Sequence, residues 1–496
     1  MPHAQTRLLP SLLLPLIALP GTALADLTAT GLWADWQTAA RGQGMSVTAQ
    51  TTTQTEDGLR LTGVETRLTQ ADGAAITAVV PLVTLTELGD GRVELAIPEG
   101  KQVTITPAGD DSSSALLAVD TSGLTVTASG TPEETDYVWS APALSVTLEE
   151  FEPGEAPLEA DLTLTATDLS GRLTGYDAEL DGPVTAVFEA AETAWAVSFS
   201  DPVSGAAMST EATQQDVVIQ AESIGMTPDG TPGDDTQLRM AFDSGSGTSR
   251  SSQSIGGTTQ LTETSHESAS LRADLTAEQG FYTGAGAGIA VTIDDPNMPV
   301  RPITLTLDEV DMAFVGPVSD ADTPQPFDVT LEVIGLAPTE ALWAQLDPAG
   351  MLPREPMTLT ADLEGQALVG PAARIPGMPE AASSDFAPTE VTVNVINLTY
   401  GEARAEATGA FSFPTPSDAA IPLSQPQPVG TLDVTLTGVL DLLTQLGQSG
   451  LVPQQQLMAA QMMIGMFAAP QPDGTMTSRI ESREDGSLFI NGNRIR

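Results

Sequence analysis

Apolar and polar residues alternate through most of the chain after Met45, which is the pattern of β-strands with one buried face. The alternation repeatedly breaks phase: two residues intervene, and the next apolar residue has the opposite parity. The breaks follow Leu85, Leu148, Leu307 and Val395. A strand that keeps one face buried tolerates such a break only with a bulge or a sharp twist. We therefore predict irregular pairing at Glu149-Glu150, Asp308-Glu309 and Ile396-Asn397.

Short turns rich in Gly and Pro join consecutive strand patterns, as at residues 89–91 and 400–401, which predicts antiparallel neighbours. No regular strand–helix alternation supports a parallel sheet. The chain is predicted to be mainly β. Antiparallel meander repeats would form an extended or two-lobed structure, with a few N-terminal and C-terminal helices packed on the sheets.

One strand–helix segment occurs twice, at residues 328–353 and 433–453. Each copy passes from an alternating strand pattern through a Gly into an apolar helical pattern, and closes on Gly-x-x-Pro. In the first copy we predict a short helix with Trp343 and Leu346 on one face. Arg354 follows its turn, where an ion pair is expected because acidic residues far outnumber basic ones. The structural keystone candidates here are Trp343, Asp347, Pro348, Pro353 and Arg354.

The first residues have the features of a secretory signal peptide. Arg7 precedes an uncharged apolar run, and Ala23-Leu24-Ala25 is a small-x-small cleavage site, which predicts cleavage between Ala25 and Asp26. A membrane anchor is the alternative, but the apolar run is too short to span a bilayer. We expect an exported protein that is periplasmic in a Gram-negative cell. The chain has no Cys, so it would fold without disulfides.

The formal net charge is −48, from 18 basic and 66 acidic residues, and it is dispersed along the chain. Such a surface repels nucleic acids and anionic lipid head groups, so nucleic acid is excluded as a partner. No stretch after the signal is long and apolar enough for a transmembrane helix. Acidity of this kind is typical of a soluble surface rather than of an acidic binding tail.

The predicted organisation has four parts. Residues 1–25 are the signal peptide, 26–226 a β-rich region with an opening helix, 227–270 a Gly/Ser/Thr-rich segment, and 271–496 a β-rich region with the strand–helix repeats. The third part is either a flexible linker or a set of weak strands. In the opening helix, Trp33 and Trp36 share one face, and packing on a sheet is favoured over gripping a ligand. Near the carboxyl end, Met458, Met462, Met463 and Met466 lie in a predicted helix, where filling a core is favoured over binding an apolar partner.

Few residues offer chemistry. The one His of the mature chain, His266, has no Gly-x-Ser-x-Gly segment to accompany it, and we expect it to be dispensable. No catalytic, cofactor or zinc site is predicted. Calcium at the acidic turns near Asp229 or Asp294 is a weak alternative to solvated turns. Carboxylates are too abundant for any pair to indicate a glycosidase-like site.

The segment LWAQLDPAGMLPREPMTLTADLEG at residues 342–365, the Trp33-x-x-Trp36 segment and the tail at residues 465–496 resemble an uncharacterised alphaproteobacterial family, domain of unknown function 2125. The resemblance implies an exported protein and assigns no functional residues. Strand-rich repeats are also similar to envelope proteins with lipid-conducting β grooves, which is an architectural analogy. We expect a non-enzymatic periplasmic protein of envelope maintenance that binds or passes a hydrophobic molecule or lipid. The alternative is a carboxylate-based hydrolase of an envelope polymer. An uncovered sheet face with alternating apolar residues would favour the first function, and carboxylates converging in a polar pocket the second.

Overall fold

The structure is a computed structural model that describes most of the chain after residue 26. The described residues are 27–42, 44–69, 75–98, 100–106, 114–131, 134–153, 158–176, 182–226, 232–318, 323–369, 386–413 and 428–496. The predicted signal peptide, its cleavage site at Ala25 and Asp26, and the acidic turn at Asp229 lie outside them. The chain divides into an N-terminal unit, Met1–Thr259, and a C-terminal unit, Gln260–Arg496, which are described separately.

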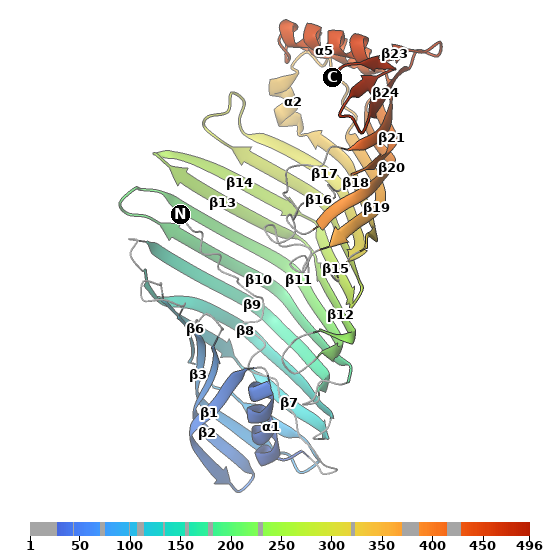
Figure 1. The fold of residues 1–496 in the computed structure, drawn as a ribbon. Helices are drawn as coiled ribbons and strands as arrows, with labels where there is room; N and C mark the ends of the chain where they lie inside the picture. Colours follow the sequence, from blue (N-terminus) through green and yellow to red (C-terminus); the bar gives the residue numbers. More distant parts are fainter. Residues whose placement is uncertain are drawn as a thin grey trace. The chain divides into compact units, whose positions relative to one another are not determined.

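The N-terminal unit consists of one helix and a series of antiparallel strands (Figure 1). Its elements are α1 (Ala29–Gly42), β1 (Met45–Thr55), β2 (Gly58–Thr69), β3 (Ala75–Glu87), β4 (Val93–Ala96), β5 (Lys101–Thr106), β6 (Ser114–Ser122), β7 (Thr125–Thr131), β8 (Glu134–Glu152), β9 (Glu159–Tyr176), β10 (Val184–Ser200), β11 (Ala207–Met226), β12 (Pro232–Ser244) and β13 (Gly247–Ile255). Strands β8 to β11 pair in sequence order, so they form a meander. Two long strands each pair with two shorter ones: β8 with β6 and β7, and β11 with β12 and β13.

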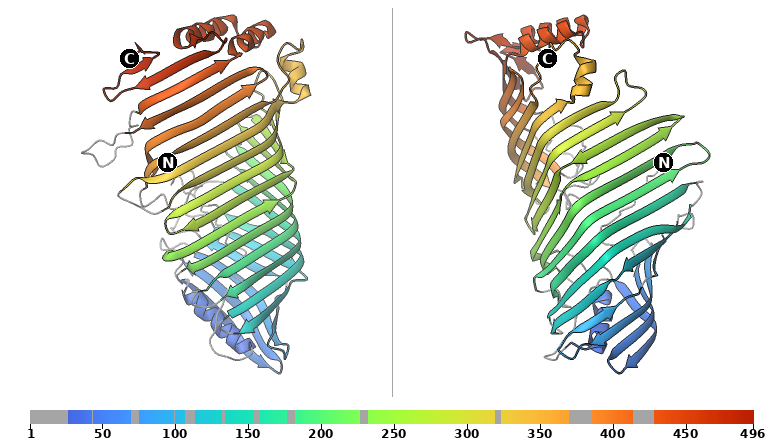
Figure 2. Two further views of the ribbon diagram at one scale, coloured as in Figure 1. Left: turned by 90° about the vertical axis from the view of Figure 1, so that its right-hand side faces the viewer. Right: turned by 180° about the vertical axis from the view of Figure 1, so that it is seen from behind.

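The C-terminal unit has the same antiparallel pattern and is drawn in light green to red in Figure 2. Its elements are β14 (Thr258–His266), β15 (Ser268–Thr276), β16 (Gln279–Asp294), β17 (Ile303–Pro317), β18 (Gln325–Pro338), α2 (Glu340–Leu346), β19 (Met357–Val369), β20 (Phe386–Tyr400), β21 (Ala403–Ser412), β22 (Val429–Thr437), α4 (Val439–Ser449), α5 (Gln454–Phe467), β23 (Ala469–Pro470), β24 (Met476–Ser482), β25 (Leu488–Ile490) and β26 (Asn493–Arg494). Strands β15 to β22 pair consecutively. The predicted mainly β, antiparallel meander fold with few helices is confirmed.

A closed hydrophobic core occurs beneath α1. Its helix face, with Leu32, Trp33 and Trp36 almost fully buried, packs on β1 to β3 as the spacing of these residues predicted. The sheet contributes side chains that are equally buried, including Leu61 and Leu85. This end of the N-terminal unit therefore has the ordinary architecture of a helix packed on a sheet.

The described part of the segment at residues 227–270 contains strands rather than an irregular linker, namely β12, β13 and β14 and the start of β15. In β13 both faces are polar: Ser249 and Ser251 alternate with Thr248 and Arg250. The four-part division proposed from the sequence stays a prediction, and the boundary between the two units of the structure falls between Thr259 and Gln260.

The predicted irregularities fall partly where the sequence placed them. In β8 the register shifts as Leu116 faces Glu150 and Leu117 faces Leu148, which leaves Glu149 as an extra residue and confirms a bulge there. In β20 the shift lies between Val393 and Ile396, whereas Ile396 and Asn397 themselves pair regularly. The prediction therefore places this irregularity slightly too far along the strand.

At Asp308-Glu309 the prediction of a bulge in that strand is wrong. The register of β17 is unchanged across these residues, and the shift lies in the neighbouring strand β18, between Val333 and Leu336. Gly335 has a φ of +80° there, and a Cβ atom on it would meet the Asp308 carboxylate. An irregularity that changes which face the side chains occupy can lie in either strand of a pair. Here it lies at Gly335, because only glycine adopts this φ without strain.

Candidate functional site

Direct cross-strand neighbours share a face of an antiparallel sheet, so the registers assign each side chain of the C-terminal unit to one of two faces. Two transverse rows run from β15 to β22 through consecutive pairs. The first row is Leu271, Gly284, Met312, Leu331, Ala361, Ile396, Ala407 and Val434. The second row is Ala273, Tyr282, Phe314, Val329, Leu363, Val393, Gly409 and Leu432. We call the surface made by these two rows the C-terminal apolar face.

The opposite face of the same strands is polar. One of its rows is Ala285, Asp311, Glu332, Thr360, Asn397, Glu406 and Thr435. Asp311 lies directly opposite Glu332, and a hydrogen bond with Asp311, followed by the charges of Asp311 and Glu332, raises the pKa of Glu309. Carboxylates thus gather on this face in a chain of strong negative charge, while neither apolar row contains a charged side chain.

The C-terminal apolar face is only partly shielded from solvent. Leu271 is 56 % and Met312 54 % exposed, and of the two rows only Gly284 and Val393 are buried. Among the described helices, α2 contacts the sheet mainly at β18 and α4 contacts it mainly at β21. No described helix lies across the middle of the face as α1 does across β1 to β3.

Aromatic rings concentrate at one end of this face. Phe386 lies 5.2 Å from Phe327 and 6.1 Å from Phe314, and Phe314 lies 6.2 Å from Tyr282, measured between ring centroids. Burial raises the pKa of the Tyr282 phenol to about 12, so the ring stays neutral across the physiological range. The sequence analysis missed this cluster, because its members lie on β16, β17, β18 and β20 and meet only through the register.

The N-terminal unit has a smaller face of the same kind. Val146, Leu164, Trp195 and Ala212 form one row across β8 to β11. Beside it, Phe199 pairs with Met208, and these two side chains are 37 % and 42 % exposed. The other face of these strands has Ser, Thr and Glu in its rows, for example Thr147, Thr163, Ala196 and Glu211. We call the first surface the N-terminal apolar face.

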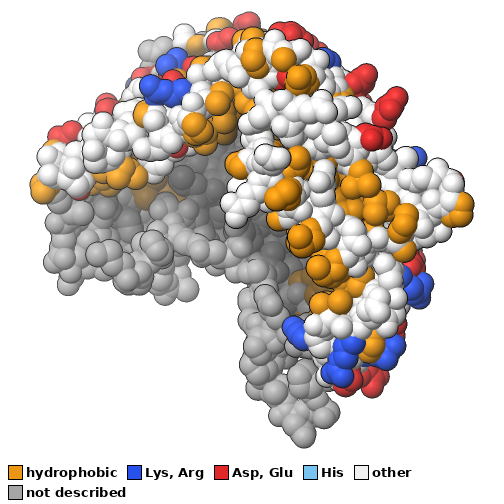
Figure 3. All heavy atoms as spheres, turned by 90° about the horizontal axis from the view of Figure 1, so that it is seen from above, with side chains coloured by type: hydrophobic (Ala, Val, Ile, Leu, Met, Phe, Trp, Pro, Cys, Tyr) orange, Lys and Arg blue, Asp and Glu red, His pale blue; other side chains and the backbone are white. Residues whose placement is uncertain are grey.

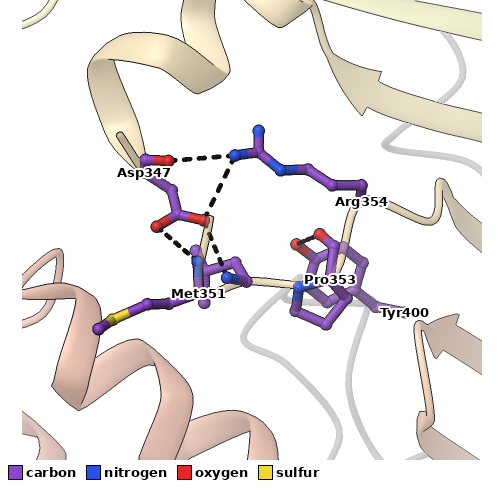
Figure 4. A network of polar contacts seen from close by, with 6 residues as sticks. Asp347, Met351, Pro353, Arg354 and Tyr400 are labelled. Carbon is purple, nitrogen blue, oxygen red and sulfur yellow. Dashed lines mark hydrogen bonds and ion pairs between the residues drawn. The ribbon is translucent and has the colours of Figure 1, made fainter. Parts of the chain in front are cut away.

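Four of the five predicted keystone residues around α2 lie close together, and Figure 4 shows three of them, Asp347, Pro353 and Arg354. The Asp347 carboxylate accepts hydrogen bonds from the backbone N–H groups of Met351 (3.0 Å) and Leu352 (2.8 Å). Arg354 donates to the Asp347 carbonyl oxygen at 3.1 Å, and its Nη2 atom lies 3.6 Å from the carboxylate. The guanidinium also lies 4.6 Å from the centroid of the Trp343 ring. The ion pair expected at Arg354 is therefore present, with Asp347.

This network holds α2 against the sheet. Thr339 caps the helix by accepting from the Leu342 N–H, and Leu342, Trp343 and Leu352 are all less than a tenth exposed. Hydrogen bonds from Leu352 and Met351, and then the Arg354 charge, hold the pKa of Asp347 below its usual range. The Tyr400 hydroxyl donates to the Pro353 carbonyl at 2.8 Å, a partner that the sequence analysis did not identify. Pro348 is exposed in the turn.

The other sequence-derived candidates lie elsewhere. Trp33 and Trp36 belong to the N-terminal unit and pack edge to face at 5.9 Å in the core beneath α1. His266 ends β14, and its Nε2 atom has no hydrogen-bond partner among the described residues. Within the described residues no three His, Cys, Asp or Glu side chains cluster so as to hold a metal ion. No described helix is both long and apolar enough to cross a bilayer.

The four methionines near the carboxyl end do not fill a core. Met458, Met462, Met463 and Met466 are each more than half exposed on α5, which corrects the interpretation favoured from the sequence. The reason is geometric: α5 packs through Leu457, Ile464 and Phe467, and the methionines occupy the remaining positions of the helix.

Residues 250–491 match the model of a protein family named DUF2125 and described as an uncharacterized protein conserved in bacteria. No curated protein matches the chain significantly. The match includes the Trp343 segment and nearly all of the tail that carried the resemblance, whereas the Trp33-x-x-Trp36 segment lies outside it. An origin in alphaproteobacteria stays a prediction. The resemblance to the family is confirmed, since the model of domain of unknown function 2125, a family conserved in bacteria, matches residues 250–491, which span nearly the whole C-terminal unit.

Proposed function

We propose that this protein is a non-enzymatic periplasmic protein that binds or passes the hydrocarbon part of a lipid, or a similar hydrophobic molecule, in maintenance of the cell envelope. One observation carries the proposal. The two faces of the C-terminal sheet are segregated, and the apolar one, with no charge in either row, is only partly shielded by the described helices, with Leu271 and Met312 more than half exposed. Apolar patches of this extent on a soluble protein usually mark a binding surface.

The physical argument concerns what can rest on such a face. Row after row offers aliphatic and aromatic side chains to the same side, spaced by about 4.8 Å from strand to strand. An acyl chain gains free energy of about 0.8 kcal/mol for each methylene that it removes from water. The polar face, with its opposed carboxylates, repels an anionic ligand and offers an apolar one no surface to bury against. The alternation of apolar and polar residues along the strands therefore determines which face of the sheet would bind the ligand.

The signal peptide predicted from the sequence supports the proposed location, because it would place the chain where envelope lipids are handled. Amino-terminal sequencing of the mature protein is expected to begin at Asp26. An intact Met1 in the envelope fraction would contradict it.

The function is tested by lipid extraction and mass spectrometry of the protein purified from its own periplasm. We expect co-purified lipid or another hydrophobic molecule. The double variant Leu271→Glu/Met312→Glu should retain far less of it, because charges then enter the first apolar row at two exposed positions. Ala410→Glu, on the polar face of β21, is the matched control and should retain as much as the wild type. Equal retention by both variants, or no bound molecule in the wild type, contradicts the proposal.

A further inference from the structure

The helical hairpin of α4 and α5 presents an apolar surface of its own. Met458, Met462 and Met466 recur at every fourth residue, so they form one stripe along α5, and Met463 lies beside it. Their side chains are 57 to 66 % exposed. Leu440 and Leu451, at 42 % and 38 %, add to the exposed apolar surface of the hairpin and its connection. We call these six residues the methionine surface. Figure 3 is turned so that the side on which Figure 1 draws α5 faces the viewer, and hydrophobic side chains gather there.

The same segment lacks charge. Residues 442–472 contain no Asp, Glu, Lys or Arg, whereas a stretch of that length would carry about five at the 17 % average of the chain. Elsewhere this chain has Asp and Glu on most exposed elements, so a long uncharged helix with its apolar stripe in solvent needs a different explanation from solubility. A surface that enters a low-dielectric medium has to be free of charges, because a charge there costs several kcal/mol.

Charge also decides which kinds of partner could cover the methionine surface. A second copy would bring another chain of net charge −48 against this one, and a bilayer rich in anionic lipid would repel it in the same way. A zwitterionic lipid surface has an apolar acyl-chain region beneath head groups that carry no net charge. Methionine side chains are flexible and polarizable, which suits a disordered acyl region better than a fixed protein pocket. Interfacial helices without basic residues bind through buried apolar area alone.

We propose that the methionine surface docks the protein on a zwitterionic lipid surface, with α5 lying in the head-group region. The inference extends the proposed function, because it names a membrane surface with which the C-terminal apolar face would exchange lipid. It does not depend on that function, since docking and lipid retention are measured separately.

The test is co-flotation of the purified, signal-cleaved chain with phosphatidylcholine vesicles. The variant is Met462→Gln/Met463→Gln/Met466→Gln, which keeps side-chain length and helix propensity. The matched control is Val203→Gln/Ile255→Gln, two apolar residues that are 80 % and 62 % exposed in the N-terminal unit. We expect the wild type and the control to float, and the triple variant to lose at least about tenfold in partitioning.

Salt dependence sharpens the test. Addition of phosphatidylglycerol to the vesicles should weaken flotation at low salt, and added salt should restore it, because screening removes the repulsion. Three results overturn the inference: no flotation of the wild type, equal flotation of the triple variant, or a dimer in light scattering that the triple variant dissolves, which would assign the surface to a second copy. A chain that floats yet retains no lipid contradicts the proposed function and leaves docking intact.

Discussion

The regions around α2 and around α4–α5 start from the same sequence pattern and end in different structures. In both, a strand runs into a short helix that is followed by a glycine with positive φ, Gly350 at +64° and Gly450 at +77°, and then by Pro353 or Pro453. Yet α2 buries Leu342 and Trp343, whereas neither α4 nor α5 has a fully buried residue. The helix pattern alone therefore does not decide whether a helix joins a core.

The residues at corresponding positions explain the difference. Aligned on the glycine and proline, Trp343 corresponds to Leu443, Asp347 to Gly447 and Arg354 to Gln454. The second copy thus lacks the ring, the carboxylate and the guanidinium that fasten the first turn. It has instead a glycine where a Cβ atom would meet the Leu457 side chain at 2.4 Å, which allows α5 to pack closely on α4. One copy returns its chain to the sheet as β19, and the other continues into a second helix.

The largest expected effect separates the two copies directly. Trp343→Ala should lower the free energy of unfolding by about 3–5 kcal/mol, because it empties a buried aromatic site. Leu443→Ala at the corresponding position, half-buried, should cost about 1–2 kcal/mol. Urea unfolding followed by far-ultraviolet circular dichroism measures both. Equal losses would mean that α2 is no better packed than α4. An unchanged midpoint for Trp343→Ala with lost lipid retention would mark the tryptophan as a functional contact instead.

The fastening of α2 should depend on pH through Asp347. Its pKa is lowered in the folded state, so its contribution to stability is present above the unfolded pKa of about 4 and is lost as pH falls through the folded pKa. Asp347→Asn should therefore reduce the unfolding midpoint at pH 7, by less than Trp343→Ala does, and the deficit should shrink below about pH 4. Thermal unfolding at several pH values gives the profile. A deficit that is the same at all pH values would indicate that the carboxylate charge is irrelevant.

Asp35 on α1 provides the opposite case, a carboxyl beside a buried helix face without such donors. Burial raises the pKa of Asp35 to about 7, and the neighbouring Tyr137 hydroxyl has no hydrogen-bond partner among the described residues. A raised acid pKa means a penalty that is absent below about pH 4, grows as pH rises and is complete above about pH 7. Asp35→Asn should raise the free energy of unfolding by about 1–2 kcal/mol at pH 8, a discounted value because the carboxyl is half-exposed. A gain that is just as large at pH 4 would contradict this assignment.

The smallest effects should be alike in both copies. Gly350→Ala and Gly450→Ala place a side chain where the backbone is left-handed but the surroundings are open. Each should cost about 1 kcal/mol, from backbone conformation alone. Differential scanning calorimetry of the two variants checks the match. A much larger loss at Gly350 would show that the α2 turn needs its glycine for packing as well.

Much of this fold could be predicted from the sequence because its information is local. Alternation at period two gives the strands, glycine turns give the antiparallel order, and the spacing of Trp33 and Trp36 gives the buried face of α1. The phase breaks indicated real irregularities. Their predicted positions were only partly correct. The break in the sequence pattern lies at Asp308, whereas the altered backbone conformation lies at Gly335 in the next strand. The strand–helix repeat was also visible, including the ion pair at Arg354.

The tertiary structure decided what the sequence left open. Whether an apolar residue is buried depends on what covers it, and nothing in the alternation of β15 to β22 says that no described helix lies across the middle of that face. The methionines of α5 have the composition of a core and the exposure of a surface, because Leu457, Ile464 and Phe467 already supply the packing contacts. Periodicity assigns residues to faces, since it follows from backbone geometry. Coverage of a face depends on segments distant in the chain, and only the packed structure shows it.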